Sequence, residues 1–463
     1  MNNLSTWKIS IFGLGYVGLS HAVAYALRGT KIVGFDVDRE KIELIRKGIS
    51  PIKEPDVVKH LENLVKTGKI KVTEDHKDAV LSTNISFICV NTPPLQDGNA
   101  DLSQVKSAIS MIGEVLRNKE RFHLVVVNST VPPSTTENVV KPLLEDVSGK
   151  KIGENIGLCF MPEFLREGSA VQDILSPWRI VIGEVDKKGG DVLYRFLLDV
   201  YRGKLPPLIR TTPVNAELIK YASNAFLAMR VSFINTIARL CELLPNSDVD
   251  VVAYGVGLDP RIGTRYLKAG PGFGGICLPK DLRALITLSE KLGFDPILFK
   301  AIYEVNEAQI RHVVEIVEML LGDLSDRVVA ILGLAFKAGI DDIRESPAIK
   351  IIDHLLERNA KVKVYDPLAM KNAKTVLKDR VFYAPSMYEC IKDSDVVIIV
   401  TDWDEFKKIE IEKLRSLMKK PIIIIDTRRI LDNKIPESDG EFLYIAIGKP
   451  LPLKLPKRIE DMR

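Results

Sequence analysis

The chain has 463 residues, of which 46% are hydrophobic and 27% charged, and its formal net charge is +4. This length exceeds what one hydrophobic core serves, so two or three domains are expected. The composition is that of an ordinary globular protein and argues against disorder and membrane insertion. The weak net charge argues against nucleic acid as a partner, because a polyanion requires clustered Lys and Arg.

At the N-terminus, residues 1–18 lead from a short apolar strand directly into glycines. The segment has neither a basic region nor a small-residue cleavage site, so the sequence predicts a cytoplasmic protein. The five cysteines are widely spaced without a C-x-x-C pair, which argues against a metal site or a disulfide framework. They are Cys89, Cys159, Cys241, Cys277 and Cys390.

Short apolar runs closed by turn residues alternate with segments of helical apolar spacing in the first part of the chain. Such alternation is typical of a doubly wound parallel sheet. The predicted parallel strands lie within residues 8–18, 31–38, 85–93, 123–133 and 179–185, and two of the predicted helices lie within 19–29 and 102–118.

The segment GLGYVG, with Gly13, Gly15 and Gly18, follows a predicted strand and opens a predicted helix. Glycines in this context permit a tight turn and let backbone amides approach a pyrophosphate at the helix N-terminus. The next strand ends at Asp36, whose carboxylate can accept hydrogen bonds from ribose hydroxyls and would repel a 2′-phosphate. The sequence therefore predicts NAD as the cofactor, although a glycine pattern by itself can mark any tight turn.

Polar residues follow two later strands of this half. Thr130 ends the strand in VVVNST before two prolines, where a hydroxyl can hold water or cofactor, or simply cap the strand. In MPEFLREGSA, Glu163 and Glu167 follow the strand IGLCF. These carboxylates could serve as a general base and a ligand-orienting group, and an exposed helix start is the alternative.

The Pro and Gly cluster at Pro206 and Pro207 interrupts the alternation and marks a domain boundary. From Val214 to about Leu244 the chain has helix formers and no Gly or Pro, which predicts one long bridging helix. Lys220 and Asn224 are four residues apart on it, so they project together and could stabilise a developing oxyanion. A solvated helix face is the alternative for such a pair.

Cys277 lies in AGPGFGGICLPKDLRAL, after three glycines and before a helical pattern. Glycines let a substrate approach the backbone, and a helix N-terminus stabilises a thiolate, so this cysteine is a candidate nucleophile. Asp281 is four residues further on and would share its helix face, where it could organise a water or a cation. A buried structural cysteine is the commoner role of a single thiol, but the glycine setting favours a reactive one.

Strand and helix alternate again after Ser325, in the runs 327–336, 360–367, 394–406 and 420–429. Together the two halves predict an α/β fold of two Rossmann-like doubly wound domains joined by a long central helix.

The chain resembles the UDP-glucose and GDP-mannose dehydrogenase family over nearly its whole length. The segments GLGYVG, SFICVNTP, NSTVPP, MPEFLREG, NAELIKYASNAFLAMRVSFIN, GPGFGGICLPKD and GLAFKAGIDDIRES occur in the family's order. The resemblance implies two successive NAD-dependent oxidations of a nucleotide sugar to its uronic acid. It also implies an NAD-binding Rossmann domain over 1–205, a central dimerisation domain carrying the cysteine loop over 206–320, and a UDP-binding Rossmann-like domain over 321–463.

By the same resemblance, Cys277 traps the aldehyde as a thiohemiacetal that becomes a thioester, and Glu163 is the acid/base for its hydrolysis. Lys220 and Asn224 stabilise the oxyanion and Asp281 orders water. The implied cofactor contacts are Gly13, Gly15, Gly18, Asp36, Lys41, Thr92, Thr130, Glu167 and Arg344, and the implied contacts of the small-molecule nucleotide sugar are Glu163, Lys220, Asn224, Tyr266, Lys268, Gly272 and Lys337. Arg261 is implied to reach a neighbouring subunit's site, which predicts a homodimer or higher homo-oligomer.

Within the family, the segments from PEFLREG to IVIG and NAFLAMRVSFIN are most similar to UDP-glucose dehydrogenases, whereas SGKKIG and FKAGIDDIRESP are similar to GDP-mannose enzymes. Ile276 and Leu278 stand where UDP-glucose enzymes usually carry Ser and Phe. GDP-mannose and UDP-N-acetylmannosamine are therefore alternative substrates. A two-electron hydroxyacid dehydrogenase and a non-catalytic nucleotide-sensing module are alternative functions.

Overall fold

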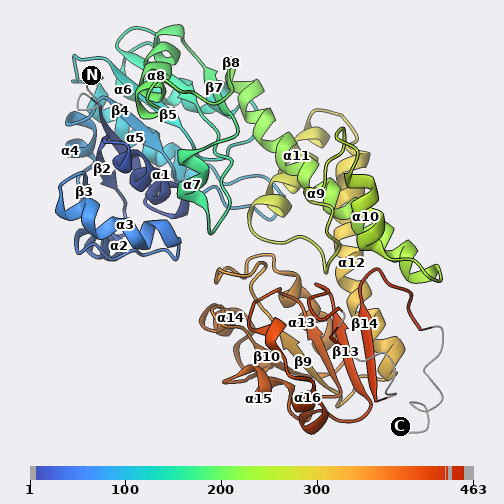
Figure 1. The fold of residues 1–463 in the computed structure, drawn as a ribbon. Coiled ribbons are helices and arrows are strands. Elements are labelled where there is room, and N and C mark those ends of the chain that lie inside the picture. The colour runs from blue at the N-terminus through green and yellow to red at the C-terminus, as the bar shows by residue number, and fades with distance from the viewer. Residues whose placement is uncertain (1–6, 433, 436–440, 453–463) are drawn as a thin grey trace. The chain divides into compact units, whose positions relative to one another are not determined.

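The computed structural model describes residues 7–432, 434–435 and 441–452. The chain forms two compact units, residues 1–223 and 224–463, and the boundary between them falls inside one long helix, α9 (Pro213–Leu243). Figure 1 shows the elements of both units along the chain.

Eight strands of the described part of the first unit form one sheet in the order β3-β2-β1-β4-β5-β6-β7-β8. The order reverses between β1 and β4, which is the topological switch point of a doubly wound fold. The strands are β1 (Lys8–Phe12), β2 (Lys31–Phe35), β3 (Ile70–Thr73), β4 (Ile85–Ile88), β5 (His123–Val127), β6 (Ile156–Phe160), β7 (Ile180–Glu184) and β8 (Leu208–Thr211).

Both faces of this sheet are buried. Alternate residues of β5 enter different hydrophobic cores, Leu124 and Val126 on one side and Val125 and Val127 on the other. The covering helices are α1 (Tyr16–Leu27), α2 (Arg39–Arg46), α3 (Pro55–Lys66), α4 (His76–Leu81), α5 (Ser103–Leu116), α6 (Lys141–Ser148), α7 (Ala170–Leu175) and α8 (Lys187–Val200), with a short π-helix at Thr136–Val140.

The end of this sheet differs from the sequence-based expectation. β7 was predicted to be parallel to the strands before it, but it runs antiparallel to β6 and parallel to β8. β8, which was not predicted, follows the proline cluster and still belongs to the first sheet. The direction of a strand depends on the crossover that precedes it, which apolar periodicity does not reveal. The division into three domains stays a prediction.

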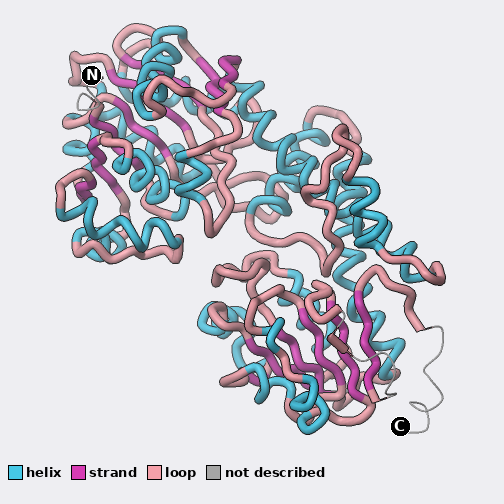
Figure 2. The backbone as a smooth tube through the Cα atoms, viewed as in Figure 1, coloured by secondary structure: helices cyan, strands magenta, loops and turns pink. Residues whose placement is uncertain are grey.

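The described residues of the second unit form a six-stranded, fully parallel sheet in the order β11-β10-β9-β12-β13-β14, with its switch point between β9 and β12. Four of these strands were predicted, and β11 and β14 were not. The strands are β9 (Val328–Leu332), β10 (Lys361–Tyr365), β11 (Phe382–Tyr383), β12 (Val396–Ile399), β13 (Ile422–Asp426) and β14 (Phe442–Ala446). Figure 2 shows these strands in magenta with helices in cyan beside them.

The helices of the second unit are α10 (Val249–Gly257), α11 (Cys277–Lys291), α12 (Ile297–Leu321), α13 (Pro347–Glu357), α14 (Met370–Leu377), α15 (Met387–Ile391) and α16 (Ile411–Leu417), with 3-10 turns at Lys378–Arg380 and Phe406–Lys408. The predicted α/β fold, with two doubly wound sheets and a long helix between them in sequence, is confirmed. No helix in the described ranges is long and apolar enough to cross a membrane.

Candidate active site

The glycine turn joins the end of β1 to the start of α1. Gly13 has a φ of +91°, which favours glycine, and a Cβ at Gly18 would lie 1.9 Å from the carbonyl oxygen of Gly13. A Cβ at Gly15, the N-cap of α1, would meet no atom within 4 Å. The turn is therefore closed on its inner side and open at the helix N-terminus, which fits a pyrophosphate approaching the backbone amides.

Asp36 follows β2 and lies beside this turn. Its carboxylate accepts hydrogen bonds from the Leu14 N–H at 2.7 Å, the Asp38 N–H at 3.0 Å and the Lys41 ammonium at 3.0 Å. The structure therefore brings the predicted glycine turn together with Asp36 and Lys41. A buried carboxylate here disfavours a 2′-phosphate, as expected for NAD.

Thr92 and Thr130 follow β4 and β5, next to the switch point. The Thr92 hydroxyl donates to the Thr130 carbonyl oxygen at 2.7 Å, so these two predicted residues meet at the carboxyl edge of the sheet. Ligands of doubly wound sheets bind at this edge.

Glu163 and Lys220 form a nearly buried ion pair. The Lys220 ammonium lies 2.8 Å from Oε1 of Glu163, and the Leu165 N–H donates to Oε2 at 2.6 Å. Burial by itself raises the pKa of the Glu163 carboxyl, but the Lys220 charge and the Leu165 N–H outweigh it, so the pKa lies below its ordinary value. Glu163 is thus held as an ionised carboxylate, which is the form that a general base requires. Glu167 lies in the same loop, ahead of α7.

Cys277 is the first residue of α11 and is exposed, whereas the other four cysteines are buried. Asp281 is in the next turn of the same helix, as predicted, and its carboxylate is buried. It accepts hydrogen bonds from the Asn224 amide at 2.6 Å and the Lys280 ammonium at 2.7 Å. Asn224 and Asp281 are therefore in direct contact within the second unit, a contact that the sequence did not predict.

The loop before Cys277 is held by buried amide side chains that the sequence analysis did not single out. Asn306 accepts from the Phe273 N–H at 2.7 Å and donates to its carbonyl at 3.1 Å. The Gly270 N–H donates to the Asn235 side-chain oxygen at 2.9 Å, and the Gln309 amide donates to the Gly270 carbonyl oxygen at 2.9 Å. The sequence signal that could have identified them is the pair Asn306 and Gln309, two amide side chains three residues apart within the otherwise apolar face of α12.

Gly272, in this loop, has a φ of +114°, and a Cβ there would lie 2.9 Å from Oδ1 of Asn306. The backbone conformation of the loop therefore requires glycine at position 272, whether or not this residue also contacts the sugar as predicted.

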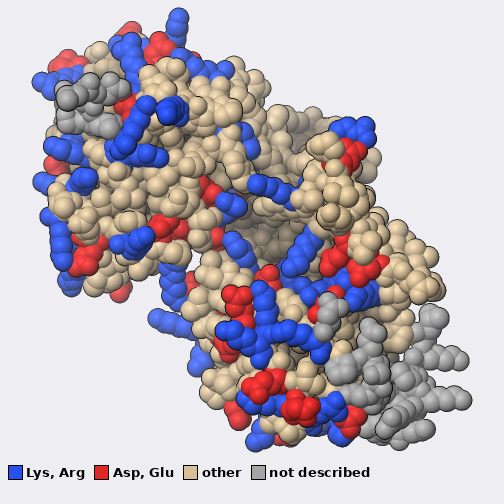
Figure 3. Space-filling model, viewed as in Figure 1, with Lys and Arg blue, Asp and Glu red and all other residues tan. Residues whose placement is uncertain are grey.

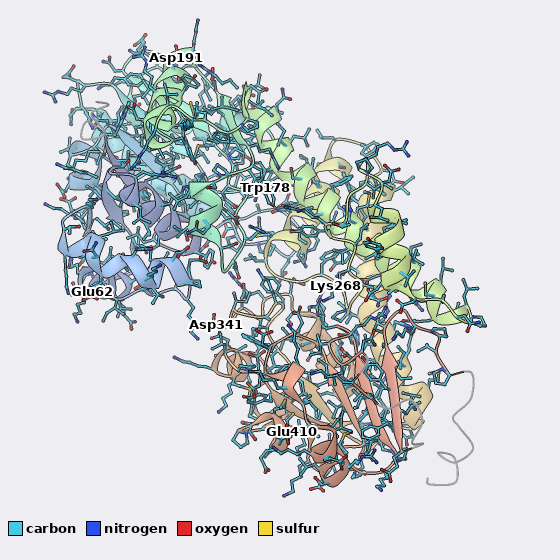
Figure 4. All side chains as sticks on the ribbon, viewed as in Figure 1. Glu62, Trp178, Asp191, Lys268, Asp341 and Glu410 are labelled. Carbon is cyan, nitrogen blue, oxygen red and sulfur yellow. The ribbon has the colours of Figure 1, made fainter. Side chains whose placement is uncertain are left out.

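Two residues predicted to contact the nucleotide sugar, Tyr266 and Lys268, precede the cysteine loop in the second unit. Lys268, labelled in Figure 4, is 4.0 Å from the carboxylate of Asp402, which follows β12. Tyr266 is exposed with a φ of +61°. Arg428, which the sequence analysis missed, follows β13 and donates from Nε to the Val400 carbonyl at 2.8 Å. Its guanidinium faces Gly270 and offers a further cation at the carboxyl edge of this sheet.

Three other predicted residues are exposed. Lys337 follows β9, and Arg344 pairs with Asp342 at 2.6 Å. The Arg344 carbonyl accepts from the Gly275 N–H at 3.1 Å, which joins this segment to the cysteine loop. Arg261 pairs with Asp259 at 2.6 Å, and its side chain is 88% exposed and accessible to another molecule.

On the face drawn in Figure 3, basic and acidic side chains are interspersed over the second sheet's domain. Within the described part of the chain, no group of three or more His, Cys, Asp or Glu side chains could hold a metal ion.

Three sequence profiles of one family match this chain in order. The NAD binding domain of the UDP-glucose/GDP-mannose dehydrogenase family matches residues 7–202, its central domain matches 214–308 and its UDP binding domain matches 330–433. Together they cover most of the sequence.

Curated relatives match over nearly their full length. UDP-glucose 6-dehydrogenase TuaD of Bacillus subtilis is 38% identical over 96% of this chain and 93% of its own. UDP-glucose 6-dehydrogenase AglM of Haloferax volcanii is 38% identical over 92% of this chain and 98% of its own.

Solved structures agree. A UDP-glucose dehydrogenase from Pyrobaculum islandicum has a TM-score of 0.88 and 39% identity, covering 97% of this chain and 99% of that one. A UDP-D-ManNAc dehydrogenase from Pyrococcus horikoshii has a TM-score of 0.82 and 29% identity, covering 96% and 99%. The chain belongs to the UDP-glucose/GDP-mannose dehydrogenase family and is an NAD-dependent oxidoreductase.

Proposed function

We propose that this enzyme oxidises the C6 alcohol of UDP-glucose to the carboxylate of UDP-glucuronate. The observation that carries the proposal is the exposed Cys277 at the start of α11, in a chain similar over nearly its full length to UDP-glucose 6-dehydrogenases. Bound NAD supplies hydride acceptors, so one alcohol, one water and two NAD⁺ give one carboxylate, two NADH and three protons.

Cys277 is the nucleophile of the proposed reaction. Its thiolate adds to the aldehyde carbon of the half-oxidised sugar and forms a thiohemiacetal, which the second oxidation converts to a thioester. Water then adds to the thioester carbon, the carbon–sulfur bond breaks, and the acid leaves while the thiolate is restored. The aldehyde is held on the enzyme throughout.

Charged and amide side chains act in the hydrolysis step and in stabilising the covalent intermediates of this reaction. The Glu163 carboxylate, held ionised by Lys220, takes the proton of the hydrolytic water. Lys220 and Asn224 stabilise the oxyanions of the covalent intermediates. Asp281 fixes Asn224 through the contact at 2.6 Å and orders water.

The two ligands are assigned to the two sheets. Gly13, Gly15, Gly18, Asp36, Lys41, Thr92, Thr130 and Glu167 would hold NAD, joined by Arg344, while Tyr266, Lys268, Gly272 and Lys337 would hold the nucleotide sugar. The open N-terminus of α1 supports the first assignment, and the cationic carboxyl edge at Lys268 and Arg428 supports the second.

The working form is proposed to be a homodimer in which Arg261 reaches the neighbouring subunit's site. Its support is an apolar stripe on α9 at a spacing of seven residues: Phe226, Phe233 and Leu240 are 55%, 49% and 51% exposed. A cytoplasmic location remains part of the proposal.

The decisive experiment measures NADH formed per nucleotide sugar consumed, with UDP-glucose, UDP-N-acetylmannosamine and GDP-mannose offered separately. We expect two NADH per UDP-glucose and a uronic acid product. A Cys277→Ser variant should not complete the conversion. One NADH per turnover without acid would instead indicate a two-electron dehydrogenase, and full activity of Cys277→Ser would contradict the covalent mechanism.

Glu163→Gln tests the hydrolytic role separately. Loss of a general base should slow turnover by about 100-fold or more, because thioester hydrolysis becomes limiting. Mass spectrometry of the quenched enzyme should then find the acyl group on Cys277. Exposed Glu154 supplies the matched control, Glu154→Gln, which should turn over like the unmodified enzyme.

UDP-N-acetylmannosamine is the second candidate substrate. The Pyrococcus horikoshii UDP-D-ManNAc dehydrogenase has the same fold at 29% identity, and Ile276 and Leu278 flank Cys277. The substrate comparison above distinguishes the two sugars.

A further inference from the structure

Glu54 is a fully buried carboxylate outside the set of residues assigned to the reaction. It occupies the N-cap position of α3, where a side chain ordinarily accepts from the first turn of its own helix, yet it makes no such bond. Its oxygens instead reach two segments far away in the sequence.

One of these segments is the start of α7. Glu54 accepts from the Gly168 N–H at 2.9 Å through Oε2 and from the Ala170 N–H at 3.1 Å through Oε1. The Gly168 amide belongs to the peptide bond with Glu167, a residue assigned to the cofactor. Glu54 therefore fixes the orientation of the peptide that follows Glu167. This peptide lies at the end of the loop that contains Glu163.

The other segment is the glycine turn. The Tyr16 hydroxyl donates to Oε2 of Glu54 and accepts from the Gly168 N–H at 2.5 Å. Tyr16 is the first residue of α1 and follows Gly15, where the turn is open to a pyrophosphate. Tyr16, Glu54 and Gly168 thus form a closed triangle of hydrogen bonds between the glycine turn and the loop before α7.

We propose that Glu54 is a positioning residue that couples cofactor binding at the glycine turn to the placement of the loop carrying Glu163 and Glu167. A cofactor that steadies the first turn of α1 steadies Tyr16, and through Glu54 the peptide after Glu167. By thermodynamic linkage, an ordered loop strengthens cofactor binding by the same factor. The relevance of this coupling to catalysis rests on the function proposed above.

The two acceptor oxygens of the Glu54 carboxyl suit this role. Burial raises the pKa of its carboxyl, while the N–H groups of Gly168 and Ala170 oppose that change. A carboxylate can accept all three donors at once. A glutamine offers one acceptor oxygen and would direct an NH₂ group at the remaining donors.

Three variants test the coupling by hydrogen exchange of the Gly168 and Ala170 amides, with and without NAD⁺. In the unmodified protein we expect NAD⁺ to slow their exchange by about fivefold or more. Tyr16→Phe should bind NAD⁺ but lose this slowing, because the link to the turn is cut. Glu54→Gln should exchange about tenfold faster in both states, weaken NADH binding and lower kcat while KM for the sugar changes little, and Glu54→Asp should restore part of the loss.

Gln172→Ala is the matched control. It removes a different hydrogen bond between α7 and α3, from the Gln172 amide to Asp56 at 2.9 Å, without touching Tyr16. It should keep the slowing by NAD⁺. The proposal is overturned if Tyr16→Phe retains that slowing, or if the unmodified protein shows none. Failure of the proposed function would appear separately, as the absence of NADH formation from UDP-glucose.

Discussion

The glycines of the glycine turn have different surroundings. Substitutions at them can therefore distinguish an effect on folding stability from an effect on cofactor binding. Gly15→Ala adds a methyl group in open space at the N-cap of α1. We expect its free energy of unfolding to stay within about 1 kcal/mol of the parent, while NADH affinity falls because the methyl group occupies the pyrophosphate's approach. Thermal unfolding and NADH fluorescence titration measure the two effects.

Gly18→Ala is the comparison. Its Cβ would lie 1.9 Å from the Gly13 carbonyl oxygen, so the turn itself must move, at a cost of about 1–3 kcal/mol. This variant should lose both stability and NADH affinity. Unchanged NADH affinity in Gly15→Ala would show that the cofactor does not approach this turn.

The positions of several site residues could be predicted from the residue type and from the strand or helix next to it in the sequence. Asp36 was expected at a strand end near the turn and lies there, because adjacent parallel strands end at one edge. The contact of Glu163 with Lys220 was not predictable, because their 57-residue separation has no periodic relation. The amides of Asn306 and Gln309 were missed since spacing does not show which loop a helix packs against.

Among the elements, α9 anchors the segment after β5 through Glu217. Its buried carboxylate accepts from the Ser134 N–H at 2.6 Å and the Thr136 N–H at 2.8 Å. Burial is the largest influence and raises the pKa of Glu217 to about 7, against the opposing hydrogen bonds. The carboxyl is therefore protonated in the folded state at pH values where it is already ionised in the unfolded chain.

This difference predicts a pH dependence of stability. A raised pKa contributes stability that is present below the unfolded pKa of 4.5 and is lost as pH rises through about 7. The contribution is at most about 3 kcal/mol. Urea unfolding at pH 5 and pH 8 should show that Glu217→Gln destabilises the protein more at pH 5 than at pH 8. Exposed Glu120 supplies the control Glu120→Gln, and an equal effect at both pH values would refute the assignment.

Elements with strong periodicity were predicted more completely than short ones. The long helix α9 and the central strands were expected because their apolar patterns are extended. The two-residue β11 and the edge strand β8 are too short or too polar to carry such a pattern. The antiparallel direction of β7 follows from tertiary pairing with β6, which no local signal encodes.

For the whole molecule, the apolar stripe on α9 predicts a subunit interface. Phe233 lies in the middle of the stripe, and a charge there would be buried in a dimer. We expect Phe233→Glu to weaken the dimer by about 2 kcal/mol or more, about 30-fold in the dissociation constant. Light scattering coupled to size exclusion would measure the mass. If Arg261 completes a neighbour's site, the monomer also loses affinity for the sugar.

Val58→Glu is the matched control, since Val58 on α3 is similarly exposed but lies outside the stripe. It should leave the mass unchanged. A monomeric parent protein, or a dimer unaffected by Phe233→Glu, would contradict the interface.

The sequence alone determined the α/β class, the two doubly wound sheets, the long helix, the cofactor and the family, because these follow from local periodicity and from ordered motifs. Tertiary structure decided which charged groups are paired, which amides hold the cysteine loop and how Glu54 joins the cofactor turn to α7. Those contacts connect residues that are tens to somewhat more than a hundred positions apart. They depend on burial and on hydrogen-bond partners that only the folded backbone brings within reach.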